Sequence, residues 1–307
     1  MPVDEFGRNL DFVEYFPLEE YVDRIELLDG LLRHLEETNK DFDEYISLLA
    51  TYADEDVVNY WIHSAHQEFR ANQDIERVRF NAEVLQEKGV FFDKLSISHK
   101  RLHDLHDFVM LASGEEYEEK NSYRHVPVNI SRYTDNGEEI FWRGANPEDV
   151  DKFMNDFIHI YKQNRIALIY SNPFLRAAIT SLLFNRIHPY TDGNGRTSRI
   201  IYNLKFTEQI NKLYQANLKL NPLNISNRIL VNKLTYVKYI NRIAFNLKED
   251  TNKAINDWLD FILTMADEQL YYSKDRLNHL IEDSQKNNSY DQEVLRRVKQ
   301  MKMSRLK

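Results

Sequence analysis

The most apolar part of the chain lies in its middle. Residues 173–187 are apolar on most faces of a helix, and Asn172 and Pro173 are natural residues for the N-cap and the first helical position. A helix that is apolar nearly all round is expected inside a bundle rather than on its surface. We therefore predict a buried helix over 173–187 and a second helix that begins near Asn194 or Gly195 and continues to about 213.

The N-terminal region also shows helical periodicity. Apolar residues at Tyr21, Ile25, Leu28 and Leu32 predict one helix over Leu18–Thr38, which Gly30 interrupts only mildly. The same period continues over 42–52 and 57–84, so this region is interpreted as a helical packing layer.

A further helix is predicted over 95–111. It carries His99, His103 and His106, but no matching set of carboxylates or thiolates accompanies them. We therefore interpret these histidines as residues of the helix surface rather than as metal ligands.

The period then changes from helical to alternating. Val126, Val128 and Ile130 alternate within 125–132, 134–137 reads TDNG, which is a strong turn signal, and 139–142 can return as a short strand. Helices are expected again over 146–165, 233–245 and 252–281, the last with an inward face that includes Trp258, Phe261 and Ile262. The sequence thus predicts an all-α bundle with one small β-hairpin.

Composition narrows the class of protein. Hydrophobic residues make up 42% of the 307 positions and charged residues 29%, as in ordinary globular proteins. The absence of cysteine excludes disulfides and thiolate zinc sites and fits a reducing compartment, so we expect a cytoplasmic location. The net charge of −9 disfavours nucleic-acid binding, and no apolar run is long enough for a signal peptide or a membrane span.

The candidate chemistry lies between the two central helices, where His188–Arg199 reads HPYTDGNGRTSR. A glycine-rich loop that enters a helix presents free backbone N–H groups and the positive end of the helix dipole, which together bind anions. Arg196 and Arg199 lie on one face of the first turn. Asp192 can hold Mg²⁺ beside phosphate oxygens, and His188 can accept a proton near neutral pH. These residues predict a site for phosphoryl or nucleotidyl transfer.

This stretch resembles the Fic motif, usually written HPFx(D/E)GNGRxxR, with Tyr190 in place of the common Phe. The resemblance implies the all-α Fic fold and transfer of AMP from ATP to a protein hydroxyl. It implies His188 as the general base and Asp192 as the Mg²⁺ ligand. Tyr190 would be a buried anchor whose hydroxyl needs a partner. The resemblance further implies phosphate binding by Gly193, Asn194, Gly195, Arg196 and Arg199.

The same resemblance extends to the hairpin and to regulation. In the family the hairpin is a flap that holds the target protein by strand addition, so residues 125–143 are expected to bind the target. Many relatives carry an inhibitory [S/T]xxxE[G/N] helix, and Ser64–Glu68 supplies SxxxE here, although Phe69 departs from the pattern. Glu293 offers a weaker second match. Ser181 stands where many relatives have another histidine.

Several alternatives stay open at this stage. The same site could remove AMP or transfer another nucleotide, phosphocholine or phosphate, and a non-catalytic nucleotide-binding interaction module is an alternative of another class. The expected organisation is an N-terminal helical layer (1–94), a Fic core (95–265) and a basic helical tail (266–307). The oligomeric state is open, with a homodimer as one alternative.

Overall fold

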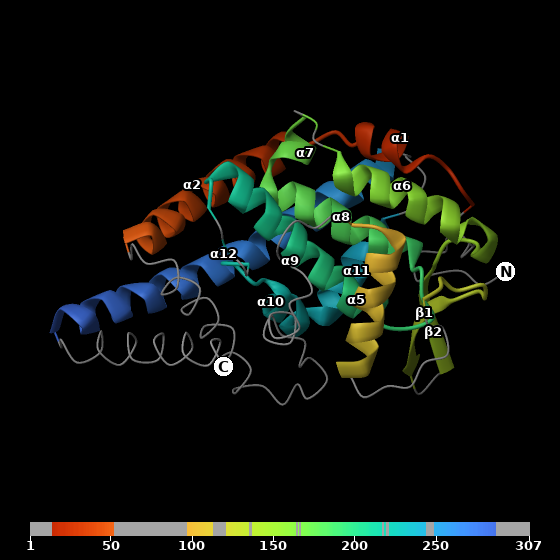
Figure 1. The fold of residues 1–307 in the computed structure, drawn as a ribbon. Helices are drawn as coiled ribbons and strands as arrows, with labels where there is room; N and C mark the ends of the chain where they lie inside the picture. The colour runs from red at the N-terminus through yellow and green to blue at the C-terminus, as the bar shows by residue number, and fades with distance from the viewer. Residues whose placement is uncertain are drawn as a thin grey trace.

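A computed structural model describes residues 14–51, 97–112, 121–134, 137–163, 165, 167–216, 218, 221–243 and 249–286. The architecture is mostly helical, with one antiparallel pair of strands (Figure 1). Along the chain the described elements are α1 (Leu18–Asp23), α2 (Asp29–Thr51), α5 (His99–Ala112), β1 (Asn129–Thr134), β2 (Gly137–Arg143), the 3₁₀ turn η2 (Pro147–Asp149), α6 (Val150–Lys162), α7 (Leu168–Ser171), α8 (Pro173–Ile187), α9 (Asn194–Leu213), α10 (Ser226–Val231), α11 (Lys233–Arg242) and α12 (Glu249–Lys286).

Helix α8 is the centre of the fold. Its residues are all buried, and its N-terminus is capped by the side chain of Asn172, which accepts hydrogen bonds from the backbone N–H groups of Phe174 and Leu175. Helices α6, α7, α9 and α12 all contact it. The prediction of a buried helix over 173–187 is confirmed, as is the start of the next helix at Asn194.

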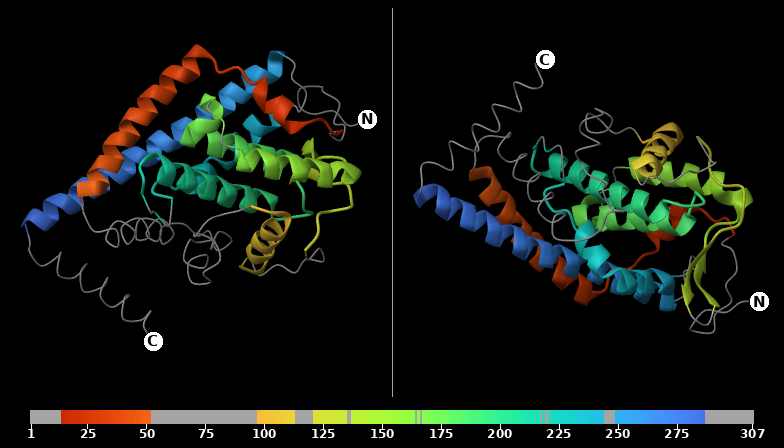
Figure 2. Two further views of the ribbon diagram at one scale, coloured as in Figure 1. Left: turned by 45° about the horizontal axis from the view of Figure 1, so that its top comes forward. Right: turned by 90° about the horizontal axis from the view of Figure 1, so that it is seen from below.

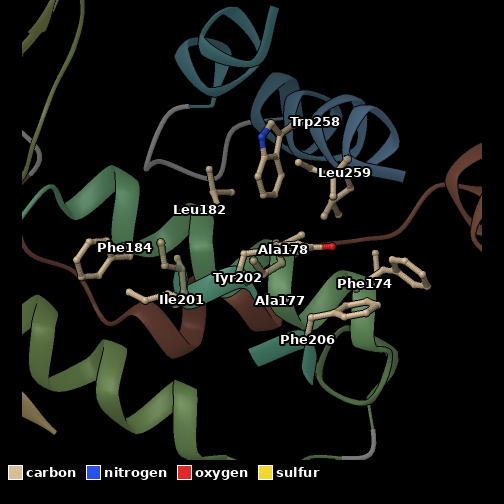
Figure 3. Close-up of a cluster of buried hydrophobic side chains, with 14 of the residues drawn as sticks. Phe174, Ala177, Ala178, Leu182, Phe184, Ile201, Tyr202, Phe206, Trp258 and Leu259 are labelled. Atoms are coloured by element: carbon tan, nitrogen blue, oxygen red, sulfur yellow. The ribbon is translucent and has the colours of Figure 1, made fainter. Parts of the chain in front are cut away.

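The core forms where α8, α9 and α12 meet (Figure 3). Small residues on α8 let its neighbours approach closely, and large apolar side chains fill the remaining space. Each large apolar side chain that is fully buried contributes about 1.5–3 kcal/mol relative to an exposed one. The cluster includes Phe174, Ala177, Ala178, Leu182 and Phe184 of α8, Ile201, Tyr202 and Phe206 of α9, and Trp258 and Leu259 of α12.

Helices α2 and α12 lie side by side along one flank of the molecule (Figure 2). His34 of α2 joins them, because Nδ1 lies 2.7 Å from Oδ1 of Asp260 and Nε2 lies 2.7 Å from Oδ2 of Asp267. Burial lowers the pKa of His34, but the two aspartates more than offset this, so its pKa is raised. The N-terminal helices are therefore an integral layer of the bundle.

The expected single helix over Leu18–Thr38 is wrong in one respect. The chain leaves α1 after Asp23 and starts α2 at Asp29, and α2 then continues without interruption to Thr51. The break has a tertiary cause, since Asn252 and Asn256 of α12 hydrogen bond to the backbone there. As a result Leu28, expected to face the core, is 46% exposed.

The hairpin pairs β1 with β2 in antiparallel register, with an irregularity between Ile130 and Ser131. Trp142 of β2 is buried, and the guanidinium carbon of Arg186 lies over the Trp142 ring, 5.5 Å from its centroid. Strand β2 also contacts α11. The hairpin thus packs beside α11 rather than standing apart from the bundle (Figure 1).

Two further expectations can be set against these elements. Helix α12 runs through the domain boundary expected at residue 265 without a break, and Trp258, Phe261 and Ile262 point inward as predicted. Among the described helices, none has both the length and the apolar character needed to cross a membrane.

Candidate active site

His188 lies at the C-cap of α8 with a left-handed backbone (φ 55°, ψ 62°). Its Nδ1 is 3.1 Å from the carbonyl oxygen of Asn185. A carbonyl oxygen can only accept, so the neutral ring carries its proton on Nδ1 and presents the lone pair of Nε2. Burial, helped by the positive charges of Arg124 and Arg186, lowers the pKa of His188 to about 4. At neutral pH this imidazole is therefore an unprotonated base.

The loop after His188 is shaped by Asn194, which is almost fully buried. Its Oδ1 accepts a hydrogen bond from the backbone N–H of Tyr190 at 3.0 Å, and its Nδ2 donates to the carbonyl of Tyr190 at 2.7 Å. Both ends of this side chain are thus used within the loop. What Asn194 can offer a ligand is its backbone N–H at the start of α9.

Gly193 is the N-cap of α9, and both its backbone conformation and its close neighbours require a residue without a side chain. Its φ is +75°, and a Cβ there would lie 2.7 Å from Sδ of Met110 and 3.1 Å from Nε2 of His106. His106 also donates from Nε2 to the carbonyl of Asp192 at 2.9 Å. Helix α5 therefore contacts the loop closely at a residue that has no side chain.

The hydroxyl group of Tyr190 has a hydrogen-bond partner that could not be identified from the sequence. This hydroxyl is 3.0 Å from Nδ1 of His103, and the Tyr190 ring stacks on that of His106 with centroids 3.6 Å apart. Tyr123 packs against both His103 and Tyr190. Burial lowers the pKa of His103, so it serves as a neutral hydrogen-bonding group beneath the loop.

The prediction of surface histidines on α5 is wrong for two of the three, His103 and His106. His103 and His106 are buried at 9% and 2% exposure, because they lie on the same helical face as Leu102, Val109 and Met110. The described residues contain no group of three or more His, Asp or Glu side chains able to hold a metal ion.

Asp192 is the exposed end of the loop, and the mostly buried side chain of Arg196 lies beside it. Oδ2 of Asp192 lies 3.3 Å from Nη2 of Arg196, and the Asp192 side chain is 69% exposed. A single accessible carboxylate fits Mg²⁺ that takes its remaining ligands from water and substrate phosphates. Asp192 can therefore contribute to a metal site that a nucleotide would complete.

Arg199 lies deeper on the same face of α9. Burial lowers its pKa, and the neighbouring hydroxyl group of Tyr236 on α11 acts in the opposite direction. In turn that hydroxyl is hydrogen bonded by Ser181, Asn185 and Ser198. Ser181 thus belongs to a buried polar cluster next to Arg199. No carboxylate in the described part of the chain pairs with Arg199, which leaves a partly buried cation at the mouth of a helix N-terminus.

The site residues predicted from the sequence therefore lie together. The neutral imidazole of His188 is on one side, and the N-terminus of α9 with Arg196 and Arg199 is on the other. Free N–H groups of the first turn and the positive dipole end make this junction suited to an oxyanion. Ser64, Glu68 and Glu293 lie outside the described residues, so the inhibitory role assigned to Ser64–Glu68 stays a prediction.

Sequence reasoning missed three residues that shape the site: Arg124, His106 and Tyr236. The signal for His106 was present, because its helical spacing from Leu102 and Met110 places it on the apolar face of α5. No local pattern marks Arg124 or Tyr236, whose partners lie far away in the sequence.

Comparison with known proteins now bears on this geometry. Residues 96–205 match the family model of the Fic/DOC family. These residues form a Fic/DOC family domain. The matched segment contains α5, the hairpin, α8 and the motif from His188 to Arg199, and Fic domain proteins are commonly transferases.

Solved structures of Fic proteins are similar to this chain to different degrees. A Fic family protein from Desulfovibrio desulfuricans G20 superimposes with a TM-score of 0.54 at 15% identity, over 82% of this chain and 76% of that one. A Fic domain containing signaling protein from Bacteroides thetaiotaomicron has a TM-score of 0.45 at 16% identity, over 78% and 97%. Fic-1 from C. elegans has a TM-score of 0.46 at 18% identity, over 86% and 73%. The Fic fold is thus shown by the first of these.

Proposed function

We propose that the chain is a protein adenylyltransferase, which moves AMP from ATP to a Tyr, Thr or Ser hydroxyl of a target protein. The observation that carries the proposal is the orientation of His188. Its Nδ1 is held by the carbonyl of Asn185, so that a neutral Nε2 remains available beside the glycine loop that opens α9. A base next to an anion-binding helix N-terminus fits attack of a hydroxyl on a bound phosphate ester.

In this reaction the target hydroxyl oxygen forms a bond to the α-phosphorus of ATP. The bond between that phosphorus and the oxygen bridging to the β-phosphorus breaks, and pyrophosphate leaves. The hydroxyl proton passes to Nε2 of His188. The N–H groups of Gly193, Asn194 and Gly195, with the guanidinium groups of Arg196 and Arg199, hold the phosphates and stabilise charge in the transition state.

Mg²⁺ is the cofactor that fits this site, with Asp192 as its protein ligand. When bound, it would neutralise part of the negative charge of the polyphosphate. Asp192 is suited to this role because its carboxylate is largely exposed and lies next to Arg196, which would contact the same phosphates.

The target protein would bind at residues 125–143. Strand β2 packs against α11, whereas Val126 is 48% exposed and Asn129 is also exposed at the start of β1. An extended segment of the target could pair with the β1 edge and bring its hydroxyl toward His188. We further propose that Glu68, with Ser64, restrains the enzyme by pairing with Arg199, an ion pair that is strong only if partly desolvated.

The experiment is an incubation of the full chain with each labelled nucleoside triphosphate and Mg²⁺, followed by intact-mass analysis of the chain and of candidate targets. A mass gain equal to one AMP that depends on ATP supports the proposal. His188→Ala should lower the rate about 10²–10⁴-fold, because it removes the general base. Full activity of that variant contradicts the assignment of His188.

The other outcomes separate the alternatives. Label from another nucleotide would indicate a different donor on the same site. Release of AMP from a modified target would indicate the reverse activity. Thermal stabilisation by ATP without any labelled product would favour a nucleotide-binding interaction module instead.

A further inference from the structure

Arg124 is the most deeply buried charged residue next to the motif, with no solvent exposure. Its guanidinium group donates hydrogen bonds to four backbone carbonyls. Nε donates to His188 at 2.6 Å, Nη1 to Val126 at 2.7 Å, and Nη2 to Ala145 at 2.6 Å and to Ile187 at 3.3 Å. One side chain therefore holds three separate pieces of backbone together.

Two of these carbonyls end the helix that carries the base. The last carbonyls of a helix lack N–H partners within it, and a left-handed residue after the helix is usually glycine. Here that residue is His188, for which the left-handed conformation is strained. Hydrogen bonds from a charged donor are stronger than those from a neutral one, so the guanidinium group of Arg124 helps to offset this strain.

The other two carbonyls belong to the roots of the hairpin. Val126 precedes β1 and Ala145 follows β2. Two backbone hydrogen bonds join the same segments. The N–H of Arg124 donates to Pro189 at 2.9 Å, and the N–H of Ala145 donates to Ile187 at 3.1 Å. Both roots of the hairpin are therefore attached to the C-terminus of α8.

Gly144 shows how tightly this junction is packed. A Cβ at that position would lie 2.7 Å from Nη2 of Arg124, 3.0 Å from Cβ of His188 and 3.1 Å from the carbonyl oxygen of Ile187. Real Cβ atoms essentially never approach another atom to 2.7 Å, so a side chain on Gly144 would displace the guanidinium group of Arg124 and crowd His188.

We propose that Arg124 is a positioning residue, which fixes the backbone of His188 against the hairpin roots so that Nε2 points at the site where the target hydroxyl arrives. The inference rests on the function proposed above. Because the hairpin would also bind the target, the same guanidinium group links the target-binding strand to the base. An error of about 1 Å in such a geometry can lower a rate about 10²-fold.

The kinetic test compares Arg124→Lys with the wild-type chain. Lysine keeps the charge but, as a single point donor, cannot hold the carbonyls of His188, Val126 and Ala145 together. We expect kcat to fall at least about tenfold, whereas KM for ATP stays within about twofold, because the phosphate site on α9 is untouched. In Arg124→Ala, added guanidinium ion should restore part of the lost rate, and methylammonium at the same concentration should not.

Arg176 provides a matched control. It is buried to a similar degree and ends α6 in the same way, by donating to the carbonyls of Ile160, Tyr161 at 3.2 Å and Gln163 at 2.9 Å. Arg176→Lys should lower the urea midpoint like Arg124→Lys, but kcat of the folded enzyme should stay within about twofold. Equal losses of kcat in both variants would overturn the proposal, since the effect would then follow stability alone.

A second measurement does not depend on activity. The ¹⁵N shifts of the His188 ring distinguish the Nδ1–H from the Nε2–H tautomer, and the wild-type chain should show Nδ1–H. Arg124→Lys should give a mixture of tautomers. If Arg124→Lys does not fold, Gly144→Ala perturbs the same junction without removing the charge and should give the same signature.

The outcomes are distinguishable from failure of the proposed function. If the wild-type chain transfers no AMP, the adenylyltransferase proposal fails, and the ring shifts still test the positioning role. An unchanged tautomer with unchanged kcat in Arg124→Lys or Gly144→Ala overturns that role.

Discussion

Gly193 offers the sharpest quantitative test of how the loop is built. Replacing it with alanine adds one Cβ at a residue whose φ is +75°. The added atom would lie 2.7 Å from Sδ of Met110 and 3.1 Å from Nε2 of His106, and His106 uses that nitrogen to bind the carbonyl of Asp192. The substitution therefore strains the backbone, crowds the contact with α5 and disturbs the hydrogen bond between His106 and the carbonyl of Asp192.

The magnitude follows from these contacts. The left-handed conformation costs an alanine about 1–2 kcal/mol. Overpacking a buried site costs about 1–3 kcal/mol, toward the lower end if the flexible Met110 side chain moves aside. We therefore expect Gly193→Ala to lower the free energy of unfolding by about 2–5 kcal/mol and to weaken ATP binding.

The assay is urea unfolding of the full chain, together with thermal stabilisation by ATP and Mg²⁺. Gly30→Ala is the matched control, because a Cβ there would meet nothing within 4 Å and alanine favours the helix, so stability should change by less than about 1 kcal/mol. A double-mutant cycle with Met110→Ala should show a coupling of about 0.5–3 kcal/mol, since the two side chains compete for one space. Wild-type stability and ATP binding in Gly193→Ala would refute this account of the loop.

Three further predictions concern the same region. Tyr190→Phe leaves Nδ1 of buried His103 without its hydroxyl partner, so urea unfolding should show a loss of about 1–3 kcal/mol, and a gain in stability would contradict the hydrogen bond. The pKa of His188 is about 4 in the folded chain and about 6.5 when unfolded, so its neutral folded form is favoured at neutral pH and this contribution is lost as pH falls below 6.5. The free energy of unfolding measured in urea should therefore fall by up to about 2 kcal/mol between pH 7 and pH 5, and His188→Asn should remove this part of the fall; an equal fall in that variant would argue against the shifted pKa. If Glu68 inhibits, Glu68→Gly should raise auto-modification with labelled ATP, whereas Arg199→Ala should abolish it in either background; unchanged labelling in Glu68→Gly would remove Glu68 from consideration.

The helices around the motif could be predicted because their signals are local. Asn172 and Pro173 specify the start of α8, and the nearly continuous apolar surface that follows can only be buried. The turn signal before Gly137 likewise specifies the hairpin, which the structure shows as β1 and β2.

The errors arise where distant residues decide the conformation. The break before α2 depends on two asparagines of α12, more than two hundred positions away along the chain. Burial of His103 depends on the presence of Tyr190 and Tyr123 opposite α5. Periodicity within one helix tells which residues share a face, but it does not tell what lies against that face.

The residues of the candidate site divide in the same way. The motif itself, from His188 to Arg199, could be read from the sequence because its chemistry is concentrated in one loop. Arg124 and Tyr236 could not, because each contributes through contacts with backbone or side chains that only the fold brings near.

The flank formed by α2 has a practical consequence for anyone who would trim this protein to its matched segment. Phe42 of α2 packs edge-on against both Phe174 and Phe206, with ring centroids 5.4 and 5.5 Å away. A chain reduced to residues 96–205 would lack both Phe42 and Phe206, and it would uncover Phe174 along with the surface that α12 now covers. Such a fragment should aggregate rather than fold, so domain boundaries drawn from homology alone would cut through the interior of this protein.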